Sequence, residues 1–263
     1  MKRVPLIIVL LAAAIAGFAQ EDNKPPQTEK AEAVIRRAVA RLGGEKYLAI
    51  KTTVGKGKFT AMRDGRASSF QNFLDIIVFP DKERTEFKGG GEHTIQVNSG
   101  DTGWIYDDAN EVLKAQTEKQ VENFKTGMRV SIDNVLRGYW RGQAALSYVG
   151  RRPASLGKRN DVIRLTYKDG FTVEFEFSAD DATPQKALYK RTGGDGETIP
   201  EEDRYAQFIE TKGIRHPNII DHFTDGIHTS RINYESIEYN RNIPDAAFAK
   251  PATPKEAKKG VKY

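Results

Sequence analysis

The sequence predicts a mainly β protein whose strands form a strongly curved antiparallel meander, an open and unclosed β-barrel with an N-terminal helix and a covering helix in mid-chain. Three observations predict this fold. Runs of alternating apolar and polar residues follow one another from Thr53 onward, as in strands with one apolar and one polar face. Short Gly-containing turns join these runs. The regular alternation of helix and strand that a parallel sheet needs is missing.

The clearest strand is Phe171 to Ser178, in which every second residue is apolar. Phe171, Val173, Phe175 and Phe177 therefore share one side of the strand. Asp169-Gly170 joins this run to the alternating run before it, and Asp-Gly between alternating runs is a strong hairpin signal. The same dipeptide stands at Asp64-Gly65 and Asp225-Gly226, and Gly89-Gly90-Gly91 offers a further turn. Gly55 and Gly57 indicate a place where two strands cross or bulge.

The segment Phe70 to Phe79 has hardly any polar face. It contains Phe73, Ile77 and Phe79, and Pro80 closes it. Such a run predicts a strand that is buried on both sides. One side can pack on a neighbouring helix, and the other must also avoid water.

Two segments have helical spacing. The first is capped by Thr28 and ends at Gly43-Gly44, where the chain needs a positive φ. The second, Glu118 to Arg141, carries an apolar stripe of about 3.6-residue period, although Gly127 weakens it. This second helix is either a lid or plug for the curved sheet or a surface helix on its outer face.

The ends of the chain predict export. Met1 to Ala19 has a basic start, a short apolar stretch and a Gly-Phe-Ala site, which is the layout of a cleaved signal peptide. Residues 20–27 form a linker, residues 28–251 the β half-barrel domain, and residues 252–263 a basic flexible tail. The apolar stretch is shorter than a bilayer requires. We therefore expect a soluble periplasmic protein with no transmembrane span in the mature chain.

Composition and motifs argue against several classes of function. The formal net charge of +5 is spread among acidic residues, so nucleic-acid binding is not expected. The chain has no cysteine, which excludes disulfides, thiol nucleophiles and cysteine metal sites. His216, His222 and His228 are evenly spaced, but Pro217 and the Asp225-Gly226 turn interrupt their strand. With no nucleophile or phosphate-loop motif either, we expect no metal, no cofactor and no catalytic residues.

Two segments resemble the periplasmic outer-membrane lipoprotein-sorting, or lipoprotein-carrier, family. They are the Trp hairpin Ser99–Tyr106 and the terminal segment Asn242–Pro251, and the order of elements, with a strand boundary at Phe79–Arg84, also fits that family. The resemblance implies an open half-barrel whose helices cover its mouth and whose apolar hollow carries lipoprotein acyl chains. It also implies a functional arginine just before the boundary proline. Phe79 stands there instead, so no cargo-release arginine is carried over.

The resulting hypothesis is a periplasmic, non-catalytic protein that carries or senses a lipid or lipoprotein acyl chain in an apolar hollow. The residues expected to line this hollow are Phe73, Ile77, Phe79, Trp104, Tyr106, Phe171, Val173, Phe175 and Phe177. The alternative is an envelope scaffold of the same fold, whose hollow is filled by its own side chains and which binds a protein partner. An enzyme is the least favoured class, because no nucleophile or metal set is present.

Overall fold

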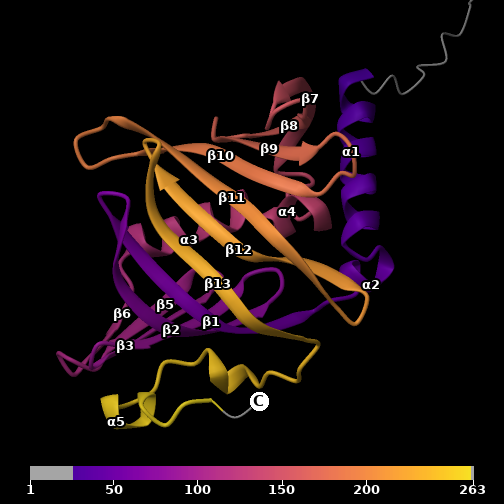
Figure 1. Cartoon of the computed structure of the whole chain (residues 1–263). Helices are drawn as coiled ribbons and strands as arrows, with labels where there is room; N and C mark the ends of the chain where they lie inside the picture. The colour runs from indigo at the N-terminus through magenta and orange to yellow at the C-terminus, as the bar shows by residue number, and fades with distance from the viewer. Residues whose placement is uncertain (1–25, 262–263) are drawn as a thin grey trace, which may run out of the picture.

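A computed structural model describes residues 26–261 and consists of one antiparallel sheet with the helices of residues 26–42 and 118–137 on one face and a C-terminal segment on the other (Figure 1). The helical elements are α1 Pro26–Leu42, α2 Glu45–Leu48, α3 Glu118–Val130, α4 Ile132–Arg137, the 3-10 helix η1 Asp245–Ala247 and α5 Pro254–Ala257. The strands are β1 Thr52–Arg63, β2 Arg66–Val78, β3 Lys82–Gly89, β4 Glu92–Ser99, β5 Thr102–Asp107, β6 Val112–Ala115, β7 Ala144–Pro153, β8 Arg159–Tyr167, β9 Thr172–Ser178, β10 Pro184–Thr192, β11 Thr198–Thr211, β12 Ile214–Thr224 and β13 Ile227–Tyr239.

The 13 strands follow the order β6-β5-β4-β3-β2-β1-β13-β12-β11-β10-β9-β8-β7. Every strand except the pair β6 and β7 therefore lies beside its neighbours in sequence, and β13 returns to pair with β1 in the middle of the sheet. β6 and β7 are the two edges and do not pair with each other, so the sheet stays open. This confirms the predicted curved, unclosed meander with an N-terminal helix and a helix in mid-chain.

The hairpins form at the predicted turns. Asp64 and Gly65 have φ values of 51° and 71°, and Asp225 and Gly226 have values of 50° and 76°. Positive φ at both central residues matches the right-handed twist of the strands that the turn joins. Lys212-Gly213, with φ values of 56° and 79°, makes the same turn between β11 and β12. The sequence pattern did not reveal this turn because lysine is not a typical turn residue.

Two glycines allow β1 and β13 to approach closely. The register between these strands shifts at Lys56/Gly57, which marks a bulge. A Cβ atom on Gly57 would lie 2.0 Å from the carbonyl oxygen of Asn233, and one on Gly55 would lie 2.5 Å from the ring of Tyr234. The predicted bulge at the glycine pair is therefore confirmed, and no larger residue fits at either position without a shift.

The helices differ from the sequence-based expectation at two points. α1 begins at Pro26, so Thr28 lies inside the helix and does not cap it; its hydroxyl donates to the carbonyl oxygen of Leu146. The stripe from Glu118 onward is not one helix, because Ser131 adopts an extended conformation between α3 and α4. The break falls at Ser131 and not at Gly127, and the Ser131 hydroxyl accepts from the backbone N–H of Asp133.

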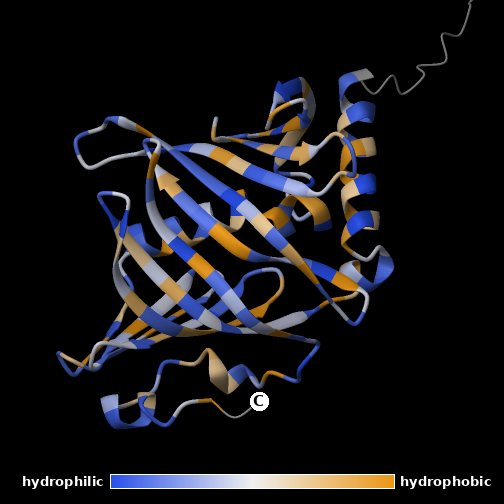
Figure 2. Ribbon diagram, viewed as in Figure 1, coloured by the Kyte–Doolittle hydropathy of each residue, from blue (hydrophilic) through white to orange (hydrophobic). Residues whose placement is uncertain are grey.

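The sheet has an apolar core on each face. On the inner face, α1 and α4 pack against β7 to β10, and α3 and α4 lie behind β11 to β13 in the view of Figure 1. On the outer face, the C-terminal segment, residues 242–261, packs against β1 to β5 (Figure 1). Figure 2 shows that orange apolar positions alternate with blue polar ones along most strands. This alternation is expected where a strand has one face covered by other elements and the other face in contact with water.

The outer core explains where two expectations fail. Ile76 of β2 is fully buried beneath the C-terminal segment, and Phe73 is buried on the inner face, but Phe70 is 63% exposed. The run is therefore buried on both sides only from Phe73 onward. The stretch expected to be a flexible tail instead contains α5, whose Ala257 is 3% exposed, and Lys258 forms a 2.6 Å ion pair with Asp108.

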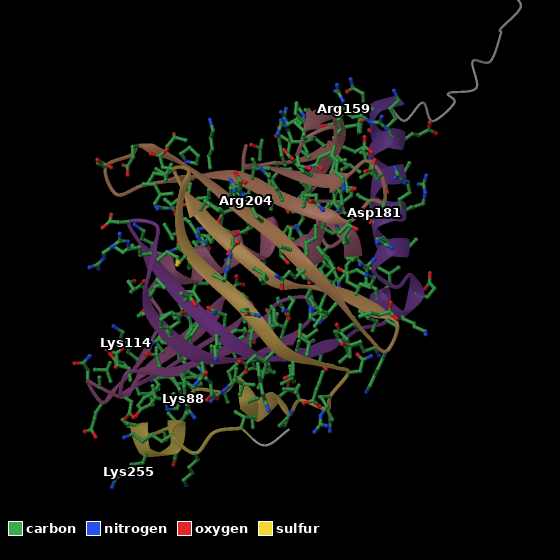
Figure 3. The ribbon with its side chains drawn as sticks, in the orientation of Figure 1. Lys88, Lys114, Arg159, Asp181, Arg204 and Lys255 are labelled. Carbon is green, nitrogen blue, oxygen red and sulfur yellow. The ribbon has the colours of Figure 1, made fainter. Side chains whose placement is uncertain are left out.

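Charged side chains gather at the periphery of the molecule. Figure 3 labels Lys88, Lys114, Arg159, Asp181, Arg204 and Lys255, all of which are exposed. No helix within residues 26–261 has the length and apolar character needed to cross a bilayer. The expected signal peptide and most of the linker lie outside the described residues.

Candidate functional site

The inner face divides into a filled half and a half with a cavity. In the filled half, Val173, Phe175 and Phe177 of β9 are all 0% exposed. They pack in one core with residues of α1 and α4, including Ala38 and Val135. Phe171 packs at the margin of this core. The sheet's own helices therefore occupy this half of the hollow.

The other half contains a cavity of about 530 Å³ between the inner face of β2 to β4 and the helices α3 and α4. Its lining consists of Ile77, Phe79, Glu83, Gln96, Gln120, Asn123, Phe124, Gly127, Met128, Ser131 and Asp133. The apolar members come from both sides, because Ile77 and Phe79 lie at the end of β2 while Phe124 and Met128 lie on α3. The space is therefore bounded by the sheet on one side and by the helix on the other.

The structure distributes the expected lining residues over three places. Ile77 and Phe79 line the cavity. Phe73 lies on the same inner face, where its ring meets Tyr234 edge to face at 5.2 Å. The β9 residues and Phe171 belong to the filled half. Trp104 and Tyr106 lie on the outer face beneath the C-terminal segment. A role of these residues in binding an acyl chain stays a prediction.

The strand register explains the position of Trp104. Ile76 pairs with Arg84, Arg84 with Val97, and Val97 with Trp104. Residues directly opposite one another share a face, so this row faces outward, where the Trp104 indole donates to the carbonyl oxygen of Phe248 at 2.9 Å. The neighbouring row, which contains Ile77 and Glu83, faces inward. A period of two identifies residues that share a face but does not say which face is the hollow.

Carboxyl groups also face the cavity. Asp133 is paired: it accepts from the Tyr47 hydroxyl at 2.7 Å and forms a 2.8 Å ion pair with Arg137. Glu83 is half-buried, and its carboxyl has no hydrogen bond or ion pair among residues 26–261. Burial, with the nearby charge of Asp75, raises the pKa of Glu83 to about 8. Burial also raises the pKa of Asp75 to about 6, although a hydrogen bond from Thr85 opposes this rise.

An arginine from α4 packs on Phe79, the residue that precedes the boundary proline. The Arg137 guanidinium lies 4.3 Å from the ring centroid of Phe79 and 4.4 Å from that of Tyr47. It also donates to the carbonyl oxygen of Ile50 at 3.0 Å. These contacts fix α4 against the strand boundary, and Arg84, which follows the proline in sequence, lies on the outer face in a 2.8 Å ion pair with Glu86.

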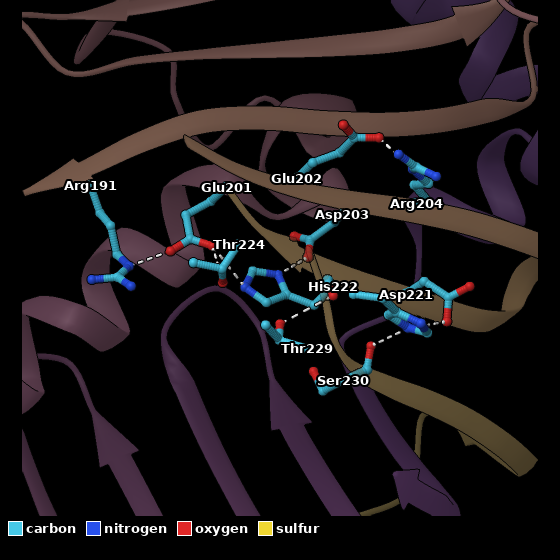
Figure 4. Close-up of polar contacts among 11 residues, drawn as sticks. Arg191, Glu201, Glu202, Asp203, Arg204, Asp221, His222, Thr224, Thr229 and Ser230 are labelled. Carbon is cyan, nitrogen blue, oxygen red and sulfur yellow. Dashed lines mark hydrogen bonds and ion pairs between the residues drawn. The ribbon is translucent and has the colours of Figure 1, made fainter. Parts of the chain in front are cut away.

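The histidines do not converge. His222 lies 2.7 Å from Asp203 and 3.1 Å from Glu201, and Figure 4 shows the three on neighbouring strands with Thr224 beside them. The hydrogen bond to Asp203 raises the pKa of His222. His228 instead contacts Asp221, which adjoins His222 in β12 and so faces the other way. Residues 26–261 contain no group of three or more His, Cys, Asp or Glu side chains that could hold a metal ion.

Sequence reasoning missed several residues of the cavity. Phe124 and Met128 belong to the helical stripe, but the stripe alone did not place them over β2 to β4. Asp75 could have been recognised from the sequence, because it is the single charged residue in the run Phe70–Phe79. A charged residue is rarely buried in a strand without a partner, so its presence there is informative. Glu83 carried no signal, because alternating charged residues are common on exposed strands.

Comparison with known proteins identifies the fold. No family model matches the sequence, and no curated protein is significantly similar to it. Among solved structures, a DUF1329 family protein from Desulfovibrio piger is similar over 83% of this chain and 97% of its own, with a TM-score of 0.59 and 12% identity. A putative outer-membrane lipoprotein-sorting protein domain from Vibrio parahaemolyticus is similar over 85% and 97%, with a TM-score of 0.58 and 11% identity.

A LolA superfamily protein from Nitrosomonas europaea is similar over 84% of this chain and 97% of its own, with a TM-score of 0.56 and 15% identity. At these identities the likeness is one of fold. The chain thus has the fold of lipoprotein-sorting proteins, in agreement with the resemblance of its short motifs.

Proposed function

We propose that this protein is a periplasmic binding protein that takes up an acyl chain of a lipid or lipoprotein in the cavity between β2–β4 and α3, and that it catalyses no reaction. The observation that carries the proposal is the cavity itself, with apolar side chains on both walls, in a protein with the fold of lipoprotein-sorting proteins. The localisation rests on the leader Met1–Ala19.

The size and chemistry of the cavity support a single chain as ligand. Its volume of about 530 Å³ lies within the ~300–1,000 Å³ of ordinary small-molecule sites. Each methylene that leaves water contributes ~0.8 kcal/mol, so a chain of about ten methylenes gives roughly 8 kcal/mol, equivalent to micromolar affinity. Phe79, Phe124 and Met128 supply adaptable apolar contacts, and methionine suits chains of variable shape.

The filled half of the inner face favours a second candidate, an envelope scaffold that binds a protein partner and no lipid. Phe175 and its neighbours contact only the protein's own core, so they offer nothing to a ligand. Native mass spectrometry of protein purified from its own envelope separates the two candidates. Co-purified lipid mass supports the carrier, whereas a lipid-free mass together with a bound protein supports the scaffold.

Filling the cavity tests the proposal directly. Gly127 lines the cavity, and a Cβ atom at this position meets no atom within 4 Å. Gly127→Phe should therefore fold but occupy the space of the chain, and we expect at least a tenfold loss of affinity for the neutral ligand 1-decanoylglycerol, measured by calorimetry. A tenfold loss corresponds to ~1.4 kcal/mol, or about two methylenes displaced.

The matched control is Lys119→Phe, at an exposed position of the same helix outside the cavity lining. It should bind 1-decanoylglycerol as the wild type does. Equal affinity in the wild type and in Gly127→Phe, with both proteins folded by circular dichroism, would place the acyl chain elsewhere. If the wild type shows no saturable binding of 1-decanoylglycerol, the carrier proposal is wrong.

A further inference from the structure

The floor of the cavity offers carboxyl and amide groups and no cation. Glu83 enters the cavity from β3 without a hydrogen bond or ion pair within the described part of the chain. The polar neighbours from β4 and α3 that line the same space, Gln96, Gln120 and Asn123, are neutral. Asp133 differs from Glu83 because Arg137 and Tyr47 already satisfy it. One carboxyl group of the cavity is thus free to receive a ligand.

Asp75 extends this acceptor region along the sheet. The register pairs Asp75 with Thr85 and Ile77 with Glu83, so Asp75 and Glu83 are diagonal neighbours on the inner face. Asp75 is 9% exposed and accepts a hydrogen bond from the Thr85 hydroxyl at 2.9 Å. Other charged or titratable groups near the pair are Tyr234 of β13 and, on α4, Asp133 with its partner Arg137. The arginine is already engaged, so the pair stays without a cation of its own.

An independent observation concerns the residue that pairs with Glu83 across the sheet. Asn98 of β4 pairs directly with Glu83, so their side chains lie together on the inner face. Asn98 is 1% exposed, and its side-chain oxygen is buried without a hydrogen-bond partner. Buried polar atoms nearly always have a partner, and an exception calls for an explanation. An incoming donor group would supply the partner for Asn98 and for Glu83 together.

We infer that the cavity binds an amphiphile with a cationic ammonium head, which Glu83 and Asn98 hold at the floor while Phe124 and Met128 of α3 cover its apolar chain. This inference rests on the proposed function and names the class of ligand. An ammonium group has three donors and no acceptor, which matches two carboxyl groups and an amide oxygen. Once Glu83 is ionised, a carboxylate head would bring a second negative charge beside it, so a fatty acid is disfavoured above the pKa of Glu83.

The affinity for the amine should depend on pH. Burial raises the pKa of Glu83 to about 8, so in the free protein this carboxyl is mostly protonated at neutral pH. The bound ammonium requires the carboxylate, and an alkylamine stays charged up to about pH 10. Affinity for the amine should therefore rise between pH 6 and pH 8.5, while affinity for a neutral ligand stays level.

Calorimetry with decylamine and 1-decanoylglycerol, below their aggregation concentrations at pH 8.5, tests the inference. We expect the wild type to bind decylamine at least tenfold more tightly than the neutral ligand, since hydrogen bonds to charged groups are stronger than those to neutral groups. Glu83→Gln keeps the size of the side chain and removes its charge, so it should abolish this preference and leave the neutral ligand unaffected. Glu92→Gln, at an exposed position of β4, should behave as the wild type.

The outcomes separate the inference from the proposed function. Binding of 1-decanoylglycerol with no preference for decylamine, or a preference that survives Glu83→Gln, overturns the inference and leaves the acyl-binding proposal standing. Binding of neither ligand overturns both. Loss of binding of both ligands in a folded Glu83→Gln protein overturns the assigned role as well, because Glu83 would then shape the cavity and not select the head group.

Discussion

At the scale of single residues, the raised pKa of Glu83 makes the stability of the protein depend on pH. Its pKa rises from 4.5 to about 8 on folding because burial disfavours the charged form. Between pH 4.5 and about pH 8, the folded state therefore holds a proton on Glu83 that the unfolded state has already lost. Stability from this group is present in full below the unfolded pKa and is lost as the pH rises through the folded pKa. Asp75 acts in the same direction, over the window from 3.8 to about 6.

We expect the contribution of Glu83 and Asp75 to the free energy of unfolding to fall by more than ~1.4 kcal/mol between pH 5 and pH 8.5. A group whose pKa differs by one pH unit between the folded and unfolded states contributes about that much. Glu83→Gln cannot ionise, so it should flatten this part of the curve. Urea unfolding at a series of pH values measures both proteins. A wild-type stability that is level or rising over this range, or a slope unchanged in Glu83→Gln, would contradict the assignment of a buried, protonated Glu83.

At the scale of secondary-structure elements, the features that depend on local chemistry could be predicted from the sequence. The hairpins at Asp64-Gly65 and Asp225-Gly226 were predictable because their turns require positive φ, which Asp and Gly tolerate. The strand Phe171–Ser178 was predictable because its alternation spans the whole element. The break between α3 and α4 was not, since Ser131 fits a helix interior as well as a cap until the neighbouring packing is known.

Local chemistry could not predict on which face of the sheet an apolar strand residue lies. Trp104 and Phe175 both alternate within strands, yet Trp104 packs under the C-terminal segment and Phe175 under the helices. Only contacts between residues far apart in sequence decide between the two faces. For the same reason, Ile77 and Phe79 of the candidate cavity were predictable from the sequence but Glu83 and Asn98 were not, because their importance comes from pairing across β3 and β4.

The junction of β1 with β13 offers a test at this scale. We expect Gly57→Ala to lower the free energy of unfolding by about 1–3 kcal/mol, the usual cost of overpacking, because its Cβ atom would lie 2.0 Å from the Asn233 carbonyl oxygen. The matched control is Gly194→Ala in the β10–β11 turn, where a Cβ atom meets nothing within 4 Å. That change should stay within about 0.5 kcal/mol. Equal stability of the two variants in urea unfolding would show that the strands are not in close contact.

At the scale of the whole molecule, the sheet is covered on its inner face by helices and on its outer face by the C-terminal segment. The second cover is held by specific contacts. The Arg84 guanidinium donates to the carbonyl oxygen of Ala247 at 3.0 Å, and the Trp104 indole donates to that of Phe248 at 2.9 Å. Because the outer face is closed in this way, β1 to β5 need no further cover there, and the proposed ligand would bind on their inner face.

Phe248 is the anchor of this outer cover, and its removal should weaken the whole domain. It is 7% exposed and lies in the core with Val97 and Trp104. Truncation of a buried phenylalanine costs about 3–5 kcal/mol, so we expect Phe248→Ala to lose stability on this order in urea unfolding. Its control is Phe70→Ala, at a side chain that is 63% exposed, which should change stability by less than about 0.5 kcal/mol.

The same variant gives a second, spectroscopic readout. With Trp140 replaced by Phe in both proteins, Trp104 is the only tryptophan of the chain. Its indole is 3% exposed in the native protein, and loosening of the C-terminal segment in Phe248→Ala should admit water and shift the emission to longer wavelength before the sheet unfolds. Ligand binding on the inner face should leave that emission unchanged. Emission that responds to 1-decanoylglycerol but not to Phe248→Ala would mean that Trp104 faces the hollow and that the C-terminal segment does not cover it.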